Sequence, residues 1–173
     1  MLTLKKKIII NWKEKSEFNP KTDNLSSENY LSPDWRREQR NHWCQTLTTR
    51  LNLLAQRIED DIETTIKEAY DPTIKGAYLL MGSTCSTKLR VYELCWSPLS
   101  KMLTRWNILV DPSHEGRGIG TAVTEMTEGL AIDLGAKQIV IDAIVNEKSL
   151  HYWAQRPGYT LVGQKAIRNL EIF

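Results

Sequence analysis

Apolar residues in the first half of the chain recur at the intervals of one helix face. They follow one another at spacings of 4, 4, 3, 4, 4 and 4: Trp43, Leu47, Leu51, Leu54, Ile58, Ile62 and Ile66. Ser32 and Pro33 precede them with an N-cap hydroxyl and a proline suited to the first helical position. Asp71 and Pro72 end the pattern. Because one helix over this range would be unusually long, we expect two consecutive helices between residues 34 and 70.

Short runs of β-branched and aromatic residues predict strands on both sides of this helical region. The N-terminal run, 2–12, predicts an edge strand, and a polar loop follows at 13–32. After the helices, three runs separated by turn residues lie at 76–82, 89–96 and 102–110. We expect these three to form an antiparallel meander.

The last third of the chain alternates helical and strand patterns. A helix is expected at 121–134, with Gly135 as its C′ residue. Residues 138–145 are nearly all apolar, which predicts a central strand buried on both faces. A short helix at 146–155 and a closing strand at 159–166, with room for one more strand, complete a single α/β domain.

Charge and composition exclude several classes of function. The chain has 23 Lys and Arg against 21 Asp and Glu, a net charge of +2 without a long basic block, so we expect no nucleic-acid partner. Its longest apolar run is far below the roughly 18 residues of a membrane span, so we expect no membrane partner. The apolar run after Lys7 is also too short for a signal peptide.

The cysteines and histidines offer no metal-binding pattern. Cys44, Cys85 and Cys95 lack C-x-x-C spacing, and the three histidines are scattered, so we expect no metal site. Free thiols would suit a cytoplasmic protein. Cys95 is a conceivable nucleophile, but without a nearby histidine we interpret it as a small buried residue.

Three alternating glycines lie where a strand ends and a helix begins. Gly116, Gly118 and Gly120 can aim backbone N–H groups at one point beside the positive end of a helix dipole, which suits a pyrophosphate. A P-loop needs a lysine that Gly120-Thr121 lacks, and a Rossmann fingerprint needs G-x-G-x-x-G spacing. A glycine turn without a ligand is the structural alternative.

This segment, 110–121, resembles the coenzyme A loop of the GCN5-related N-acetyltransferases (GNAT), usually Arg/Gln-x-x-Gly-x-Gly/Ala. Residues 146–159 are similar to the last motif of that family, an Asn, a short helix bearing an aromatic residue, and then Gly-aromatic. The resemblance covers 76–163 as the acetyl-CoA-binding core, while 1–72 fit only loosely as the variable N-terminal strand and helices. It implies one GNAT-like domain, 1–173, with a mixed, mostly antiparallel central sheet flanked by helices and with splayed fourth and fifth strands.

The resemblance also implies an activity and a set of binding residues. The activity would be transfer of an acetyl group from acetyl-CoA to an amine by direct attack, with no acyl-enzyme. Two strand residues would contact the pantetheine arm and the thioester, Leu109 and Val110. The loop backbone would hold the pyrophosphate, and one asparagine would lie near the pantetheine: Glu115, Gly116, Arg117, Gly118, Ile119, Gly120 and Thr121, with Asn146.

The sequence departs from the family pattern at the loop and at the catalytic positions. Glu115 occupies the Arg/Gln position, so we expect only its backbone N–H to help, while Arg117 restores positive charge. Arg105-Trp106-Asn107 stand where the family often has a glutamate base, which leaves Glu93 as a candidate base through water. Tyr152 is the candidate proton donor to the thiolate, and packing is its alternative role, because Pro157 is an extra residue in the last motif.

The acceptor cannot be read from the sequence beyond an amine on a small molecule or a peptide. A non-catalytic coenzyme-A-binding regulatory module is the alternative function, and a nucleotide-dependent enzyme is the third. The sequence also leaves a homodimer open.

Overall fold

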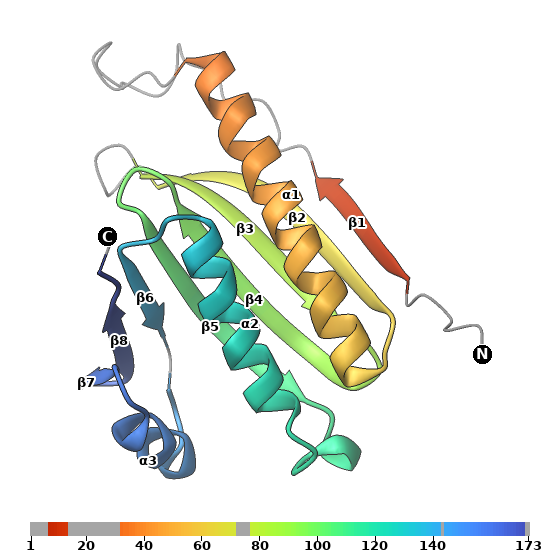
Figure 1. The fold of residues 1–173 in the computed structure, drawn as a ribbon, viewed down its shortest axis with the longest axis vertical. Helices are drawn as coiled ribbons and strands as arrows, with labels where there is room; N and C mark the ends of the chain where they lie inside the picture. Colours follow the sequence, from red (N-terminus) through yellow and green to blue (C-terminus); the bar gives the residue numbers. More distant parts are fainter. Residues whose placement is uncertain (1–6, 14–31, 72–76, 143, 172–173) are drawn as a thin grey trace.

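An eight-stranded sheet forms the centre of the molecule (Figure 1). The computed structural model describes residues 7–13, 32–71, 77–142 and 144–171. The strand order is β1-β2-β3-β4-β5-β6-β8-β7. The elements are β1 (Ile8–Lys13), α1 (Pro33–Ile58), β2 (Ile62–Asp71), β3 (Ala77–Cys85), β4 (Leu89–Ser97), β5 (Met102–Val110), α2 (Ile119–Asp133), β6 (Gln138–Ile141), α3 (Glu147–Gln155), β7 (Thr160–Val162) and β8 (Lys165–Asn169).

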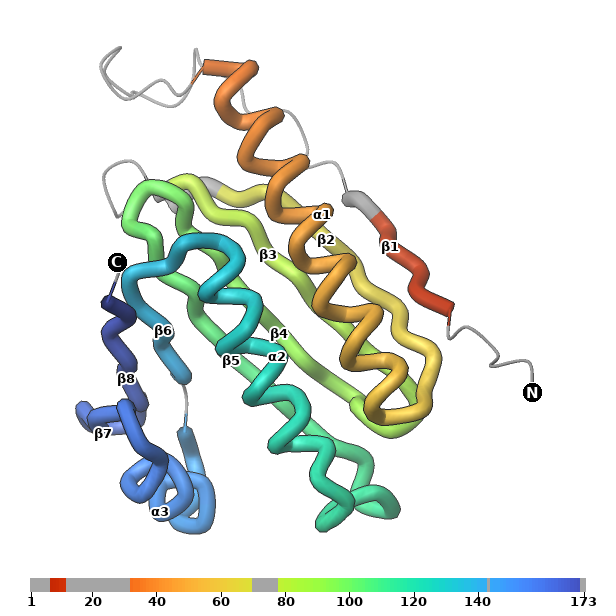
Figure 2. The backbone as a smooth tube through the Cα atoms, viewed as in Figure 1, coloured from red at the N-terminus to blue at the C-terminus, as the bar shows by residue number. Residues whose placement is uncertain are grey.

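The sheet is mixed and mostly antiparallel, as the resemblance implies. Only the β1–β2 and β5–β6 pairs are parallel. The meander of β3, β4 and β5 is confirmed, and β1 lies at one edge of the sheet. Helices α1 and α2 lie side by side on one face, while α3, β7 and β8 form a separate lobe next to β6 (Figure 2).

Helix α1 begins and ends at well-defined caps. The Ser32 hydroxyl accepts a hydrogen bond from the Trp35 N–H at 3.2 Å, as expected of an N-cap. At the other end Glu59 adopts a left-handed conformation with φ +54°, which stops the helix at Ile58. The helix buries a stripe of apolar side chains against the sheet: Trp43, Leu47, Leu51, Leu54 and Ile58.

The predicted second helix is wrong. Residues from Ile62 onward form β2, in which Ile62, Thr64 and Ile66 alternate on the face that packs under the helices. The neighbouring positions, Glu63 and Thr65, point to the opposite face. The Thr64 hydroxyl is satisfied inside the core by the Thr84 hydroxyl of β3, at 2.9 Å.

The C-terminal strands also differ from the prediction. Strand β6 is interior and buried, as expected, but it ends at Ile141, and Val145 is 77% exposed. The predicted closing strand, 159–166, is two strands, because Gly163 at φ +60° turns the chain between β7 and β8. The expected segments 2–6 and 14–31 lie outside the described residues.

The described helices are not long and apolar enough for any of them to cross a bilayer.

Candidate active site

Strands β5 and β6 pair only where they begin. Met102–Arg105 lies against Gln138–Ile141, and the Asp142 N–H donates to the Arg105 carbonyl at 2.9 Å as the last link. Beyond Arg105 the chain after β6 turns away toward α3 (Figure 1). Within the described ranges, no strand pairs with this side of 106–110. The backbone groups along that edge are therefore available to a ligand.

The glycine loop, residues 116–120, lies at one end of this edge. The space beside its backbone is open, and we call it the glycine cradle. Gly116 and Gly118 have φ values of +72° and +78°, which only glycine adopts without strain. A Cβ atom placed on Gly116, Gly118 or Gly120 would meet no atom within 4 Å. Gly118 is the N-cap of α2 and provides no side-chain cap. Uncapped N–H groups beside empty space at a helix N-terminus fit an anion such as a pyrophosphate.

Asp111 fixes the start of the loop. Its carboxylate accepts hydrogen bonds from the Ser113 hydroxyl at 2.5 Å and the Ser113 N–H at 3.0 Å. Arg90 of β4 donates to it from Nε at 2.8 Å. These bonds, those from Ser113 first, hold the pKa of Asp111 well below its usual range. The start of the loop is thus held in shape by Ser113 within it and by Arg90 of the neighbouring strand.

The loop residues predicted from the sequence divide into three groups. Leu109 and Val110 lie at the end of β5, as expected. The side chains of Glu115, Arg117 and Thr121 are exposed, whereas Ile119 is buried in the core. The Glu115 N–H, which we expected to face the ligand, donates inside the turn to the Pro112 carbonyl at 3.4 Å.

A β-bulge in β5 brings Glu93 and Asn107 together. Glu93 pairs with Asn107 and Leu94 with Arg105, so Trp106 is the extra residue. The Asn107 amide donates to the Glu93 carboxylate, Nδ2 to Oε2, at 2.5 Å. Both residues lie on the sheet face opposite α1 and α2.

A depression of about 250 Å³ lies on this open face. Four strands supply its lining: Thr65, Lys67, Met81, Gly82, Ser83, Glu93, Leu94 and Trp106. The candidate base Glu93 therefore borders a space large enough for a small amine or a side chain of a peptide.

The last motif, residues 146–159, lies across from α2 and the open edge of β5. We call the space between them the cleft. Asn146, expected near the pantetheine, caps α3, because its Oδ1 accepts from the Ser149 N–H at 2.8 Å. The Tyr152 hydroxyl accepts a hydrogen bond from Arg156 Nη1 at 2.8 Å, and the side chain is 40% exposed. Trp153 is buried instead and packs edge-on against Tyr152. The helix thus directs the tyrosine, not the tryptophan, toward the solvent.

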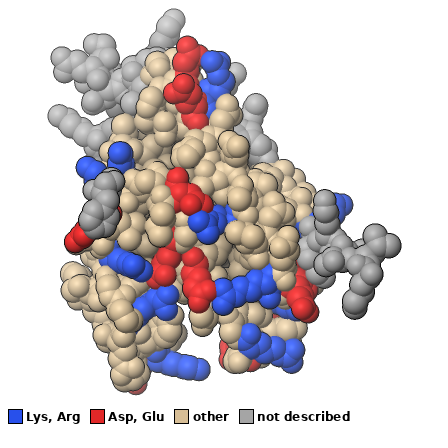
Figure 3. Space-filling model, in the orientation of Figure 1, with Lys and Arg blue, Asp and Glu red and all other residues tan. Residues whose placement is uncertain are grey.

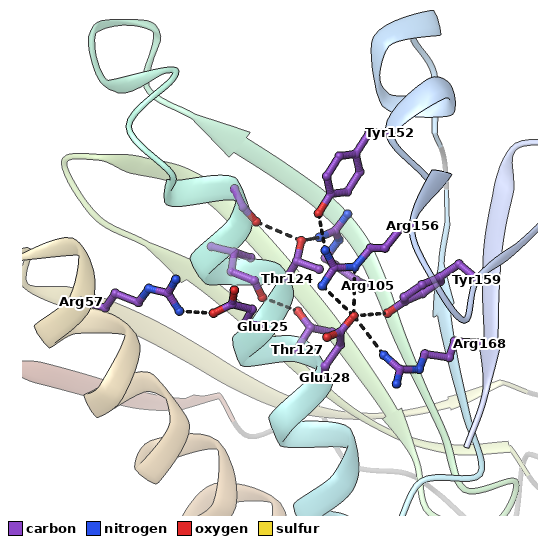
Figure 4. Close-up of polar contacts among 12 residues, drawn as sticks. Arg57, Arg105, Thr124, Glu125, Thr127, Glu128, Tyr152, Arg156, Tyr159 and Arg168 are labelled. Carbon is purple, nitrogen blue, oxygen red and sulfur yellow. Dashed lines mark hydrogen bonds and ion pairs between the residues drawn. The ribbon is translucent and has the colours of Figure 1, made fainter. Parts of the chain in front are cut away.

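Glu128 of α2 joins the two walls (Figure 4). Its Oε1 accepts from Arg156 Nε at 3.1 Å and Nη2 at 3.0 Å, and from the Tyr159 hydroxyl at 3.1 Å. Arg168 of β8 lies 3.3 Å from the same oxygen. Burial and the nearby Glu128 carboxylate both raise the pKa of Tyr159. For Arg156, burial alone would lower the pKa, but the hydrogen bonds and charge of Glu128 raise it. Charged side chains line the space between the two lobes (Figure 3).

Arg105 lies at the point where the two strands separate. It is 5% exposed, its guanidinium stacks over Trp153 at 5.0 Å, and its Nη1 donates to the Thr124 hydroxyl at 3.3 Å. Desolvation lowers its pKa. The sequence signal for this residue was an arginine inside a mostly apolar strand. Glu128 and Arg156 gave no signal at all.

The other reactive groups are less favourable. Cys95 is buried, and burial raises the pKa of its thiol to about 12, so it is not a nucleophile at neutral pH. All three cysteines are free thiols. In the part of the chain that the structure describes, no three His, Cys, Asp or Glu side chains gather as a metal site.

Solved structures similar to this chain include several acetyltransferases. Nourseothricin acetyltransferase matches at 19% identity and a TM-score of 0.41, over 53% of this chain and 65% of that one. A GNAT-family acetyltransferase from Staphylococcus aureus Mu50 matches at 13% identity and 0.40, over 54% and 68%. An acetyltransferase from Bacillus cereus matches at 14% identity and 0.34, over 82% and 95%. No protein-family model and no curated protein matches the chain.

The element order around the glycine loop decides the fold. A meander, the loop, α2, a parallel strand that leaves its neighbour, and a short helix follow one another as the resemblance implies. The fold is GNAT-like. Strands β5 and β6, which pair only over Met102–Arg105, correspond to the fourth and fifth strands that the resemblance implies are splayed.

Proposed function

We propose that this chain transfers an acetyl group from acetyl-CoA to an amine by direct attack, without an acyl-enzyme. One observation carries the proposal: an open glycine cradle at the N-terminus of α2 adjoins a strand edge without a partner in the described ranges. A pyrophosphate in the cradle and a pantetheine arm along Leu109 and Val110 would use both features. The bound acetyl-CoA would supply the activated thioester.

Residues of the open face would then handle the amine. A neutral amine in the depression can attack the thioester carbonyl, and Glu93, oriented by Asn107, accepts the released proton through water. A C–N bond forms and the C–S bond breaks. A backbone N–H of the 106–110 edge polarises the carbonyl oxygen.

Tyr152 is the proposed donor of the proton that the departing sulfur takes up. Its hydroxyl accepts from Arg156, so its own proton remains free for donation. The three free cysteines suit a reducing compartment, and we propose the cytoplasm as the place of this activity.

The test is a thiol-release assay with acetyl-CoA and mixtures of small amines and peptides, combined with calorimetric binding of acetyl-CoA, NAD and ATP. The enzyme is expected to bind acetyl-CoA and release thiol only when an amine is present. Binding without release would favour the coenzyme-A-binding regulatory module. Binding of NAD or ATP in place of acetyl-CoA would overturn the proposal.

A further inference from the structure

Arg105 is a buried cation without a carboxylate partner among the described residues. Its hydrogen-bond acceptor, the Thr124 hydroxyl, is neutral, and the other side of its guanidinium rests on the ring of Trp153. The nearby Asp142 pairs with Lys165 of β8 at 3.1 Å instead. An arginine stays protonated in a protein, so this charge is buried at a considerable cost.

The surrounding groups add positive charge and do not neutralise Arg105. Among the ion pairs of the described ranges, the Glu128 carboxylate pairs with Arg156 and Arg168, and no carboxylate pairs with Arg105. Besides burial, the groups that influence the pKa of Arg105 are the hydroxyls of three tyrosines and one further guanidinium: Tyr92, Tyr159, Tyr152 and Arg156. The cluster thus has three guanidinium groups for one carboxylate (Figure 4).

The position of Arg105 relates this charge to the proposed cleft. The glycine loop is the outer end of the open β5 edge, and Arg105, where β6 pairing stops, is its inner end. Val110, the last residue of β5 before the loop, lies about 16 Å along the strand from Arg105, five residues at roughly 3.3 Å each. A thioester with its phosphates at the loop and its pantetheine arm along this edge would therefore extend toward Arg105.

We propose that Arg105 receives a carboxylate at the far end of the acyl group, so that the cleft takes short dicarboxylic acyl thioesters in addition to acetyl-CoA. This inference rests on the proposed function. A guanidinium pairs with a carboxylate through two parallel hydrogen bonds, which an acetyl group cannot supply. The reaction is otherwise unchanged: the C–N bond forms, the C–S bond breaks, sulfur takes the proton, and the distal carboxylate stays intact.

The donor is a better source of this carboxylate than the acceptor. Arg105 faces the helices, whereas Glu93 and the depression lie on the opposite face of the sheet. An acceptor carboxylate in the depression would approach the Glu93 carboxylate, which repels it.

The experiment compares succinyl-CoA with butyryl-CoA, which has the same acyl length and no charge. Calorimetry and kcat/KM with one fixed amine are measured for the wild type, Arg105→Met and Arg168→Gln. Arg168→Gln is the matched control because it removes a guanidinium that is already paired with Glu128. In the wild type and in Arg168→Gln, succinyl-CoA is expected to bind at least about tenfold more tightly than butyryl-CoA. In Arg105→Met this preference is expected to vanish while acetyl-CoA affinity changes little.

Several results would overturn the inference. Equal binding of the two thioesters by the wild type would refute the inference, whether or not Arg105→Met folds. A preference for succinyl-CoA that survives in Arg105→Met would also refute it. A preference for glutamate over its amide as acceptor, without any donor preference, would assign the carboxylate to the acceptor instead. Failure of every thioester to bind, acetyl-CoA included, would instead refute the proposed function.

Discussion

Gly118 provides the sharpest test of the glycine cradle. Its φ of +78° costs an alanine roughly 1–2 kcal/mol, since a Cβ clashes with the backbone in the left-handed region. No atom lies within 4 Å of the added Cβ, so no packing cost follows. For a chain of this size Gly118→Ala should lower the melting midpoint by about 2–8 °C. The added Cβ would occupy the space proposed for the phosphate and hold it away from one backbone N–H. Loss of that hydrogen bond to a charged group, about 1.5–3 kcal/mol, should weaken acetyl-CoA binding roughly 10- to 150-fold.

Gly135→Ala is the matched control. Gly135 also has a left-handed backbone, φ +66°, and an open Cβ position, but it lies at the other end of α2, about 22 Å away. Both variants should lose similar stability in a thermal scan, and only Gly118→Ala should lose calorimetric affinity for acetyl-CoA. Equal affinity in the two variants would show that the phosphates bind elsewhere.

Three further predictions concern single side chains. Tyr152→Phe should reduce thiol-release turnover about 100-fold without changing acetyl-CoA affinity; normal turnover would leave the hydroxyl only its bond with Arg156. Glu128→Gln should lower the free energy of unfolding by about 1.5–3 kcal/mol in urea, because the shared acceptor of Arg156 and Tyr159 loses its charge; an unchanged midpoint would show that the Glu128 charge does not stabilise the fold. Iodoacetamide at pH 8 should label the exposed Cys85 and not Cys95, whose pKa burial raises to about 12; mass spectrometry reports both sites.

The elements around the glycine loop could be predicted because their signals are local. Turn residues divide the three meander strands, and Gly135 at φ +66° ends the region of α2 as a C′ glycine should. The glycine cradle depends on three glycines within five residues and on the helix that follows them. No distant contact is needed to form it.

The second of the two helices expected before residue 70 is wrong because the spacing was ambiguous. A four-residue interval fits the period of a helix, but it is also twice the period of a strand. Ile58, Ile62 and Ile66 satisfy both readings. The discriminating signal was Thr64, which lies between the last two isoleucines and is buried with them. The β-branched residues of Ile62-Glu63-Thr64-Thr65-Ile66 favour the strand that the structure contains.

The polar network of the cleft could not be predicted, since its members come from separate elements. Glu128, Arg156 and Arg168 are 28 and 12 residues apart in sequence. They meet only because α2 and the α3–β8 lobe stand on either side of the same opening. In the sequence each looks like an ordinary charged residue on a solvated helix or strand.

The bulge at Trp106 connects the two halves of the proposed site. Regular alternation along β5 would put Asn107 on the helix face with Arg105, but the extra residue turns Asn107 to the open face beside Glu93. The bulge begins at the residue where pairing with β6 stops. A single local irregularity thus positions the candidate base and frees the strand edge. It also leaves Arg105 on the helix face and Asn107 on the open face, so in the proposed reaction the donor and the acceptor would approach the thioester carbonyl from different sides.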